Sequence, residues 1–170
     1  MMMMSIFILF LTNLLNAQNI TGKTAKVSVS GTSPMHDWTM TSTAANFSAT
    51  ISNNSITNIK FTTAANSLKS TKGKMMDKKA YKALKAEQNP NISFTATAIN
   101  LGKSNITGRL TIAGVSKNVT LPISVVKNGT SYTITASESM KMSDFGMETP
   151  GFLGVHTGDA VTVSVNIVAN

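Results

Sequence analysis

The chain of 170 residues has no cysteine and few acidic residues, and both shortages limit its chemistry. Without cysteine it forms no disulfide, has no thiolate nucleophile and offers no cysteine ligand for zinc or iron–sulfur centres. Fifteen Lys and Arg stand against seven Asp and Glu, so the formal net charge is +8 at pH 7. No His-x-x-x-His motif and no closely spaced set of carboxylates occurs, so the sequence predicts neither a metal site nor a cofactor.

Long hydrophobic runs are also scarce, and the N-terminal run from Met1 to Ala17 is the clearest one. It is shorter than the roughly 20 residues that span a bilayer, and it ends in a small residue before Gln18. We interpret residues 1–17 as a secretory signal peptide, with an N-terminal core strand or a membrane anchor as the alternatives. The expected location is therefore periplasmic or secreted. The remaining residues 18–170 have the usual size of one domain.

Period-two alternation of apolar and polar residues dominates the rest of the sequence, most clearly from Val161 to Ile167. Side chains alternate between the two faces of a strand, so this pattern buries one face and leaves the other in water. Helical spacing replaces it only between Met75 and Glu87. The sequence therefore predicts an all-β, antiparallel up-and-down barrel of about eight strands with one short helix, and a β-sandwich is the alternative.

Alanine stands at several expected core positions where a larger residue would fill space. Ala45 and Ala49 accompany Phe47 in one segment, and Ala96 and Ala98 accompany a phenylalanine in another. A closed sheet with small inward residues leaves a cavity, whereas a sheet built to pack solid uses bulk. The sequence thus predicts a lumen that binds an apolar molecule.

Three segments together resemble the YceI-like family of exported proteins, in the His-Asp-Trp-bearing form found in Bacteroidetes-type bacteria. They are His36-Asp37-Trp38, the Gly-Arg-Leu-Thr-Ile-Ala-Gly-Val-Ser-Lys hairpin of residues 108–117, and Ser143-Asp144-Phe145-Gly146 followed by residues 158–163. The resemblance implies an elongated, lipocalin-like barrel with a helix over one opening. It also implies binding of a long isoprenoid or other lipid in the lumen, without catalysis.

Two positions depart from the family pattern. Met142 stands where many members have arginine, and Ala113 stands where histidine is common. An arginine near the lumen pairs well with a phosphate or carboxylate, so its absence favours a neutral, amide-like or fatty ligand over a pyrophosphate.

The residues expected to contact such a ligand are the large apolar side chains of the alternating segments and of the Met- and Phe-rich segment near Ser143. They are Phe47, Phe61, Phe94, Leu110, Leu121, Met140, Met142 and Phe145. The resulting hypothesis is an exported, non-catalytic protein that sequesters or transports a long apolar molecule, such as an isoprenoid, a fatty acid or an amide.

Two other functions remain open. Lys78, Lys79, Lys82 and Lys85 lie on one face of the expected helix, which suits a membrane surface or a polyanion, or merely a solvated face; no specific nucleic acid is expected. A hydrolase would use His36 or His156, each close to an aspartate, but no matching nucleophile is evident.

Structural roles are expected for three further residues. Asp77 should cap the N-terminus of the lysine-bearing helix, and Asp144 and Gly146 should form a turn. Edge strands and barrel mouths are able to associate, so a homodimer is a further open alternative.

Overall fold

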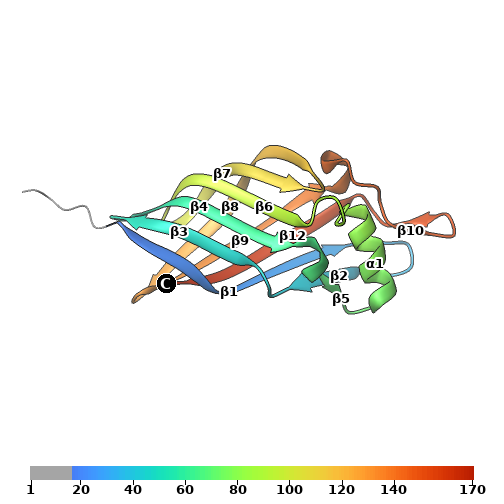
Figure 1. Cartoon of the computed structure of the whole chain (residues 1–170), viewed down its shortest axis with the longest axis horizontal. Coiled ribbons are helices and arrows are strands. Elements are labelled where there is room, and N and C mark those ends of the chain that lie inside the picture. The colour runs from blue at the N-terminus through green and yellow to red at the C-terminus, as the bar shows by residue number, and fades with distance from the viewer. Residues whose placement is uncertain (1–16) are drawn as a thin grey trace, which may run out of the picture.

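The computed structural model describes residues 17–170, and over this range it is a closed antiparallel β-barrel of eight strands. The predicted signal peptide lies, apart from Ala17, outside the described residues. The predicted all-β barrel is confirmed (Figure 1). Its strands are β1 (Gln18–Gly31), β3 (Asn46–Ser52), β4 (Ser55–Ala64), β6 (Asn91–Asn100), β7 (Gly102–Ile112), β8 (Val115–Asn128), β9 (Ser131–Lys141) and β12 (Ala160–Ala169).

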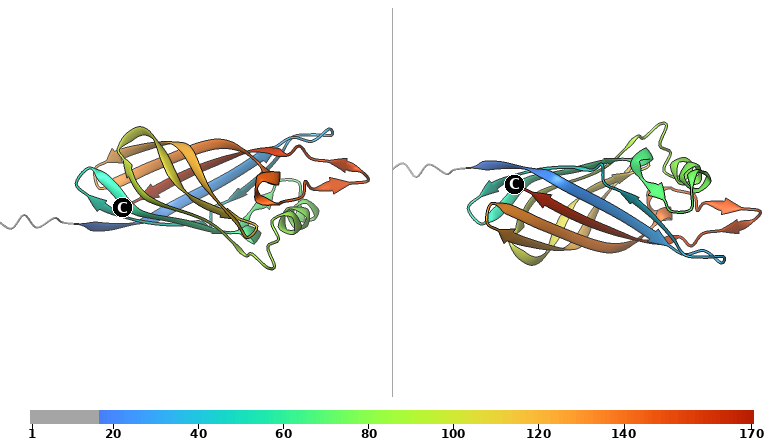
Figure 2. Two further views of the ribbon diagram at one scale, coloured as in Figure 1. Left: turned by 90° about the horizontal axis from the view of Figure 1, so that it is seen from above. Right: turned by 90° about the horizontal axis from the view of Figure 1, so that it is seen from below.

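Pairing between β1 and β12 closes the barrel. Val27 lies opposite Val165 and Val29 opposite Val163, so the first and last strands form one continuous ladder. All remaining pairings join barrel strands that follow one another along the chain, as an up-and-down barrel requires. The strands cross the long axis obliquely, as the two side views show (Figure 2).

The remaining elements gather at one end of the barrel, which we call the mouth (Figures 1 and 2). The opposite end, where β8 turns into β9, is called the far end. The mouth elements are β2 (Trp38–Ser42), η1 (Ala65–Ser67), β5 (Lys69–Ser70), α1 (Lys74–Ala83), η2 (Met142–Phe145), β10 (Gly151–Phe152) and β11 (Val155–His156). Among the described residues α1 is the single α-helix, and none of their helices is long and apolar enough to cross a bilayer.

Side-chain hydrogen bonds hold α1 against the chain that precedes it. Asp77 is buried and its Oδ1 accepts the backbone N–H of Ser70 at 2.7 Å. The prediction that Asp77 caps the helix is therefore wrong, because Gly73 occupies the N-cap and the carboxylate bonds outward to β5. Tyr81 donates its hydroxyl proton to the Leu68 carbonyl at 2.8 Å. Lys69 donates to the same hydroxyl at 2.6 Å, which raises the pKa of Lys69.

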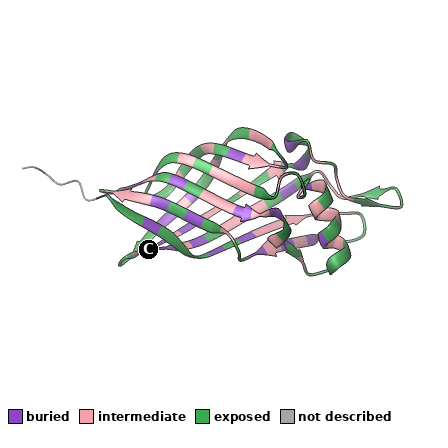
Figure 3. Ribbon diagram, in the orientation of Figure 1, coloured by how far each residue is buried: buried purple, intermediate pink, exposed green. Residues whose placement is uncertain are grey.

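Buried and exposed residues alternate along the barrel strands (Figure 3). One core cluster fills the far end around Ile20, Ile56 and Val125, and a second lies at the mouth around Trp38 and Leu84. Several inward side chains along the cavity, such as Phe61, Phe94 and Val165, are only half buried.

A local bend in β4 explains why Ala98 does not face the core, although the sequence predicted that it would. Asn58 adopts a left-handed conformation with a φ of 51°. The pairing of β4 with β3 shifts by one residue at this point. Inward positions in β4 therefore change phase between Ile56 and Ile59. The paired strand β6 changes phase with it, so Ala98 is exposed although Ala96 faces the core.

Gly108 provides a stability test of the packed inner wall. A Cβ added there would lie 2.5 Å from the Thr95 carbonyl oxygen and closer still to the Phe94 ring. Gly108→Ala should therefore destabilise the barrel by about 1–3 kcal/mol, the usual cost of overpacking, as measured by urea unfolding. The neighbouring substitution Thr107→Ala, on the exposed face, should cost less. Equal stabilities of Gly108→Ala and the wild type would contradict this packing.

Candidate functional site: the barrel lumen

A cavity of about 210 Å³ runs inside the barrel and reaches the mouth. Its lining is almost wholly apolar, and all eight residues singled out from the sequence take part in it. Their role in binding a ligand stays a prediction. The residues in question are Phe47, Phe61, Phe94, Leu110, Leu121, Met140, Met142 and Phe145.

Four of these side chains form one row across neighbouring strands. Phe47 lies opposite Phe61, Phe61 opposite Phe94, and Phe94 opposite Leu110. Directly opposed residues in antiparallel strands have Cβ atoms about 4.5–5.5 Å apart and point to the same face. The row therefore makes a continuous apolar wall, in which Phe61 and Phe94 are only half buried.

Small β-branched residues make the facing wall. Val163 and Val165 on β12, with Val27 and Val29 on β1, line the cavity, and none of them was singled out from the sequence as a binding residue. Their alternation was the signal that could have found them. Because valine is much shorter than phenylalanine, this wall leaves room that the aromatic row does not fill.

Polar lining residues occur only towards the mouth. Thr63, Lys79 and Glu138 line the cavity near this end, whereas the lining towards the far end is formed by isoleucine, leucine and phenylalanine. Glu138 lies opposite Val163 and between Ala136 and Met140 in the inward alternation of β9. It was also missed, because a charged residue in an alternating strand is normally expected on the outer face.

Trp38 lines the cavity, and its indole N–H is a buried hydrogen-bond donor without a partner. Its side chain is only 8% exposed, and its indole ring lies over Gly31, where a Cβ would collide with it. The indole Nε1 is buried and has no hydrogen-bond partner among the described residues. A buried Trp N–H usually has a partner, whereas this one is unpaired and covered by protein atoms, so the ring has to turn before an acceptor atom of a ligand reaches it.

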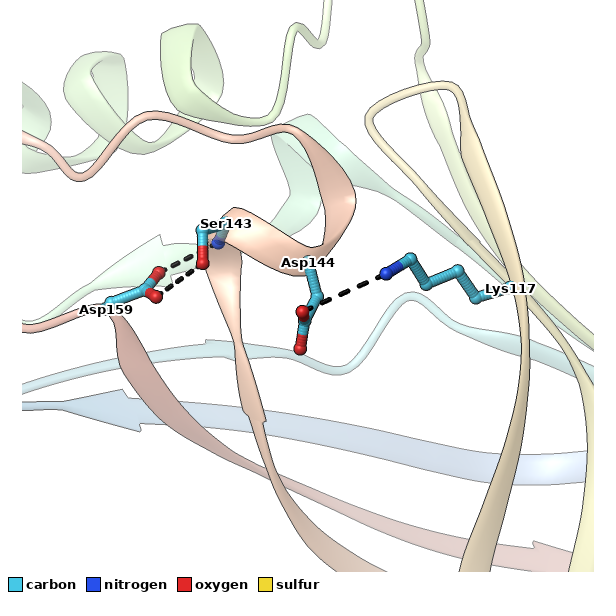
Figure 4. A network of polar contacts seen from close by, with 4 residues as sticks. All are labelled: Lys117, Ser143, Asp144 and Asp159. Atoms are coloured by element: carbon cyan, nitrogen blue, oxygen red, sulfur yellow. Dashed lines mark hydrogen bonds and ion pairs between the residues drawn. The ribbon is translucent and has the colours of Figure 1, made fainter.

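Polar contacts at the mouth fix η2, which contributes Met142 and Phe145 to the lining (Figure 4). The Asp159 carboxylate accepts the Ser143 backbone N–H at 2.8 Å and the Ser143 hydroxyl at 2.5 Å. Asp144, expected to form a turn, lies in η2 and approaches Lys117 at 3.9 Å. Gly146 ends η2 in the left-handed conformation.

Neither histidine is hydrogen-bonded through Nε2 to a nucleophile among the described residues. The Nδ1 atom of His156 lies 2.9 Å from the Thr149 carbonyl oxygen and 3.4 Å from the Thr149 hydroxyl. A carbonyl can only accept, so Nδ1 carries the proton and cannot take one from that hydroxyl. His36 Nδ1 lies 3.2 Å from the Asp37 carbonyl oxygen in the same way. Among residues 17–170, no three His, Asp or Glu residues cluster as metal ligands would.

The pKa of Asp159 gives a pH test of the mouth. The hydrogen bonds from the Ser143 hydroxyl and backbone N–H hold this pKa below its ordinary value of 3.8. The carboxylate therefore stabilises the fold above about pH 3.8, and this contribution is lost as the pH falls through the lowered pKa.

Asp159→Asn should accordingly lower the melting temperature at neutral pH, and the difference from the wild type should shrink in acid. Thermal unfolding followed by circular dichroism at a series of pH values measures this. Ser143→Ala should show the same trend, because it removes a donor to the carboxylate. A deficit that stays constant down to the most acidic pH would contradict the assignment.

Comparison with known proteins places these features in a wider group. The family model of the YceI-like domain matches residues 16–169. Among curated proteins, none matches this sequence. Several solved structures share the fold at low sequence identity. BcnA of Burkholderia cenocepacia has a TM-score of 0.75 and 23% identity, over 86% of this chain and 96% of its own.

Two further structures are similar. A polyisoprenoid binding domain from Saccharophagus degradans, implicated in plant cell wall breakdown, has a TM-score of 0.70 and 12% identity, over 89% of this chain and 97% of its own. The YCEI protein of Campylobacter jejuni has a TM-score of 0.55 and 21% identity, over 97% of this chain and 89% of its own. At such identities the likeness shows the fold alone, whereas the family match covers nearly the whole chain. The protein therefore belongs to the YceI-like domain family.

Proposed function

We propose that this protein is an exported carrier that binds one long apolar molecule in its lumen and releases it chemically unchanged. The observation that carries the proposal is the apolar cavity of about 210 Å³ inside the barrel that the protein's own side chains leave unfilled. An apolar cavity offers water no hydrogen-bond partners and favours an apolar guest. Each CH₂ group moved out of water contributes about 0.8 kcal/mol, so a long chain binds tightly without any charged contact.

The family supports a lipid as the ligand class, and so does the similar structure described as a polyisoprenoid binding domain. The barrel is elongated (Figure 2), and the flexible thioethers of Met140 and Met142 line its cavity together with the aromatic row. Such a lining suits a flexible chain of the isoprenoid or fatty acyl type.

The distribution of polar groups supports one orientation of the ligand. Trp38, Lys79 and Glu138 line the cavity towards the mouth, and the far end has only apolar side chains. We therefore place the apolar tail towards the far end and the polar end of the ligand at the mouth. An oxygen atom of that polar end would accept the free indole N–H.

Export and the absence of catalysis are parts of the same proposal. The apolar run of residues 1–17 supports export, and the lack of cysteine is compatible with a periplasmic location. The two histidines support a non-catalytic role, because neither of them lines the lumen.

Filling the lumen tests the proposal. Val163→Trp places an indole in the cavity, so the lipid recovered by mass spectrometry from organic extracts of the purified protein should fall at least tenfold, or about 1.4 kcal/mol. Thr162→Trp is the matched control, since residue 162 is exposed on the same strand and should keep wild-type lipid.

A second, smaller substitution keeps the test valid where Val163→Trp does not fold. Val165→Phe narrows the same wall and should lower the lipid content in part. No lipid in the wild-type extract, together with no uptake of added isoprenoid or fatty acid, would overturn the proposed function.

The Trp38 donor is tested by Trp38→Phe, which keeps an aromatic ring and removes the N–H. Loss of one neutral hydrogen bond of about 1 kcal/mol should weaken binding of a long-chain alcohol about fivefold. Binding of an alkane of the same length, measured by displacement of a fluorescent probe, should stay unchanged. Equal weakening of both ligands would show that Trp38 acts through packing alone.

A further inference from the structure

Exposed apolar side chains are concentrated at the mouth of the barrel. Six large apolar residues are exposed among the described residues, and five of them lie in mouth segments: Met35, Met75, Phe152, Leu153 and Val155. The sixth, Val126, lies on β8 near the far end. Leu153, at the tip of the hairpin formed by β10 and β11, is 87% exposed. Single exposed apolar residues are common, but such a concentration at one end marks an interaction surface.

Three separate segments at the mouth carry these residues. They are the loop between β1 and β2, the helix α1, and the β10–β11 hairpin, which extends beyond the barrel at this end (Figures 1 and 2). A cation–π contact joins two of them, since Lys79 Nζ lies 4.6 Å from the centre of the Phe152 ring. We call the five exposed apolar residues the mouth tips.

Positive charge lies next to the mouth tips. Lys74, Lys78 and Lys82 are exposed on α1, and Lys85 follows directly. Residues 69–87 contain seven lysines and two acids, of which Asp77 is buried and bonded to Ser70. The acids Asp37 and Glu148 lie in the loops beside the tips, so the excess positive charge is concentrated on the side of α1.

We infer that the mouth docks onto the surface of an anionic lipid bilayer. Apolar tips that enter the headgroup region and lysines that stay at the phosphate level are the two components of reversible membrane binding. A polyanion such as nucleic acid would use the lysines but not the exposed Leu153 and Phe152. A second copy of the chain would bring another positively charged mouth against the first.

Docking of this kind explains why the cavity reaches the same end. The inference rests on the proposed function, because a lipid passes from a bilayer to the lumen without crossing water only if the mouth lies against the bilayer. The inner side of α1 lines the cavity through Met76, Ala80 and Ala83, whereas Lys74, Lys78 and Lys82 of the same helix are exposed. The helix therefore lies between the lumen and the membrane.

The test is vesicle co-sedimentation of the full chain, with phosphatidylcholine vesicles that contain or lack phosphatidylglycerol. All variants share residues 1–17, so differences between them report on the mouth. The triple variant Lys78→Gln, Lys82→Gln, Lys85→Gln should bind the anionic vesicles on the order of 100-fold more weakly. The control triple Lys23→Gln, Lys26→Gln, Lys103→Gln removes equal charge from exposed barrel positions and should have a much smaller effect.

The apolar tips are tested separately. Phe152→Ser with Leu153→Ser should weaken binding at least tenfold, whereas Val126→Ser at the far end should not. These positions are exposed, and circular dichroism checks that each variant is folded. Binding by the lysine triple equal to that of the wild type would overturn the inference. So would unchanged binding of the tip variant, which would indicate a general polyanion surface.

Lipid content of the same preparations separates this inference from the proposed function. Lipid in the extract together with no vesicle binding would overturn docking and leave the carrier function standing. Vesicle binding that requires the lysines and tips, in protein that never holds lipid, would support docking and overturn the carrier.

Discussion

Closure of the sheet between β1 and β12 is the constraint on which the lumen depends. An open sheet must cover its apolar face with a second layer, whereas a closed one turns that face onto itself. Because Val27 and Val29 meet Val165 and Val163 along this ladder, the seam adds only short side chains to the interior. The aromatic row on the facing wall cannot fill the space alone. The cavity therefore follows from topology together with side-chain size, and no single residue creates it.

Polarity along the barrel axis gives that cavity a direction. The far end is sealed by tightly buried residues such as Ile56 and Val125, so an apolar chain gains most by lying there. Trp38 and Glu138 lie towards the mouth, where a ligand's polar atoms remain near water. A buried donor without a partner costs free energy in the empty protein, and an acceptor on the ligand removes that cost. In the proposed complex these groups favour one orientation of the ligand and an oxygenated lipid over a pure hydrocarbon.

Sequence patterning predicted the strands and the helix because side-chain direction within an element is a local property. It also placed Phe47, Phe61, Phe94 and Leu110 among the lumen residues, which line the cavity as one row. Their alignment depends on register between strands, and no pattern within one strand fixes it. The left-handed conformation of Asn58 could not be predicted either, because many asparagines in the sequence have ordinary extended backbone. Non-local pairing and single-residue bends mark the limit of such predictions.

The helix α1 connects the interior of the barrel with its surroundings. One side of the helix lines the cavity and the other side carries exposed lysines. A movement of the helix therefore changes the cavity wall and the position of these charges together. It is held by few polar contacts, chiefly Asp77 to Ser70 and Tyr81 to Leu68, and both partners lie in one short segment next to β5. Elements with few buried contacts open at low free-energy cost. If the mouth docks as proposed, a bilayer that engages the lysines acts on a helix that lines the lumen, and docking and ligand passage are then coupled steps.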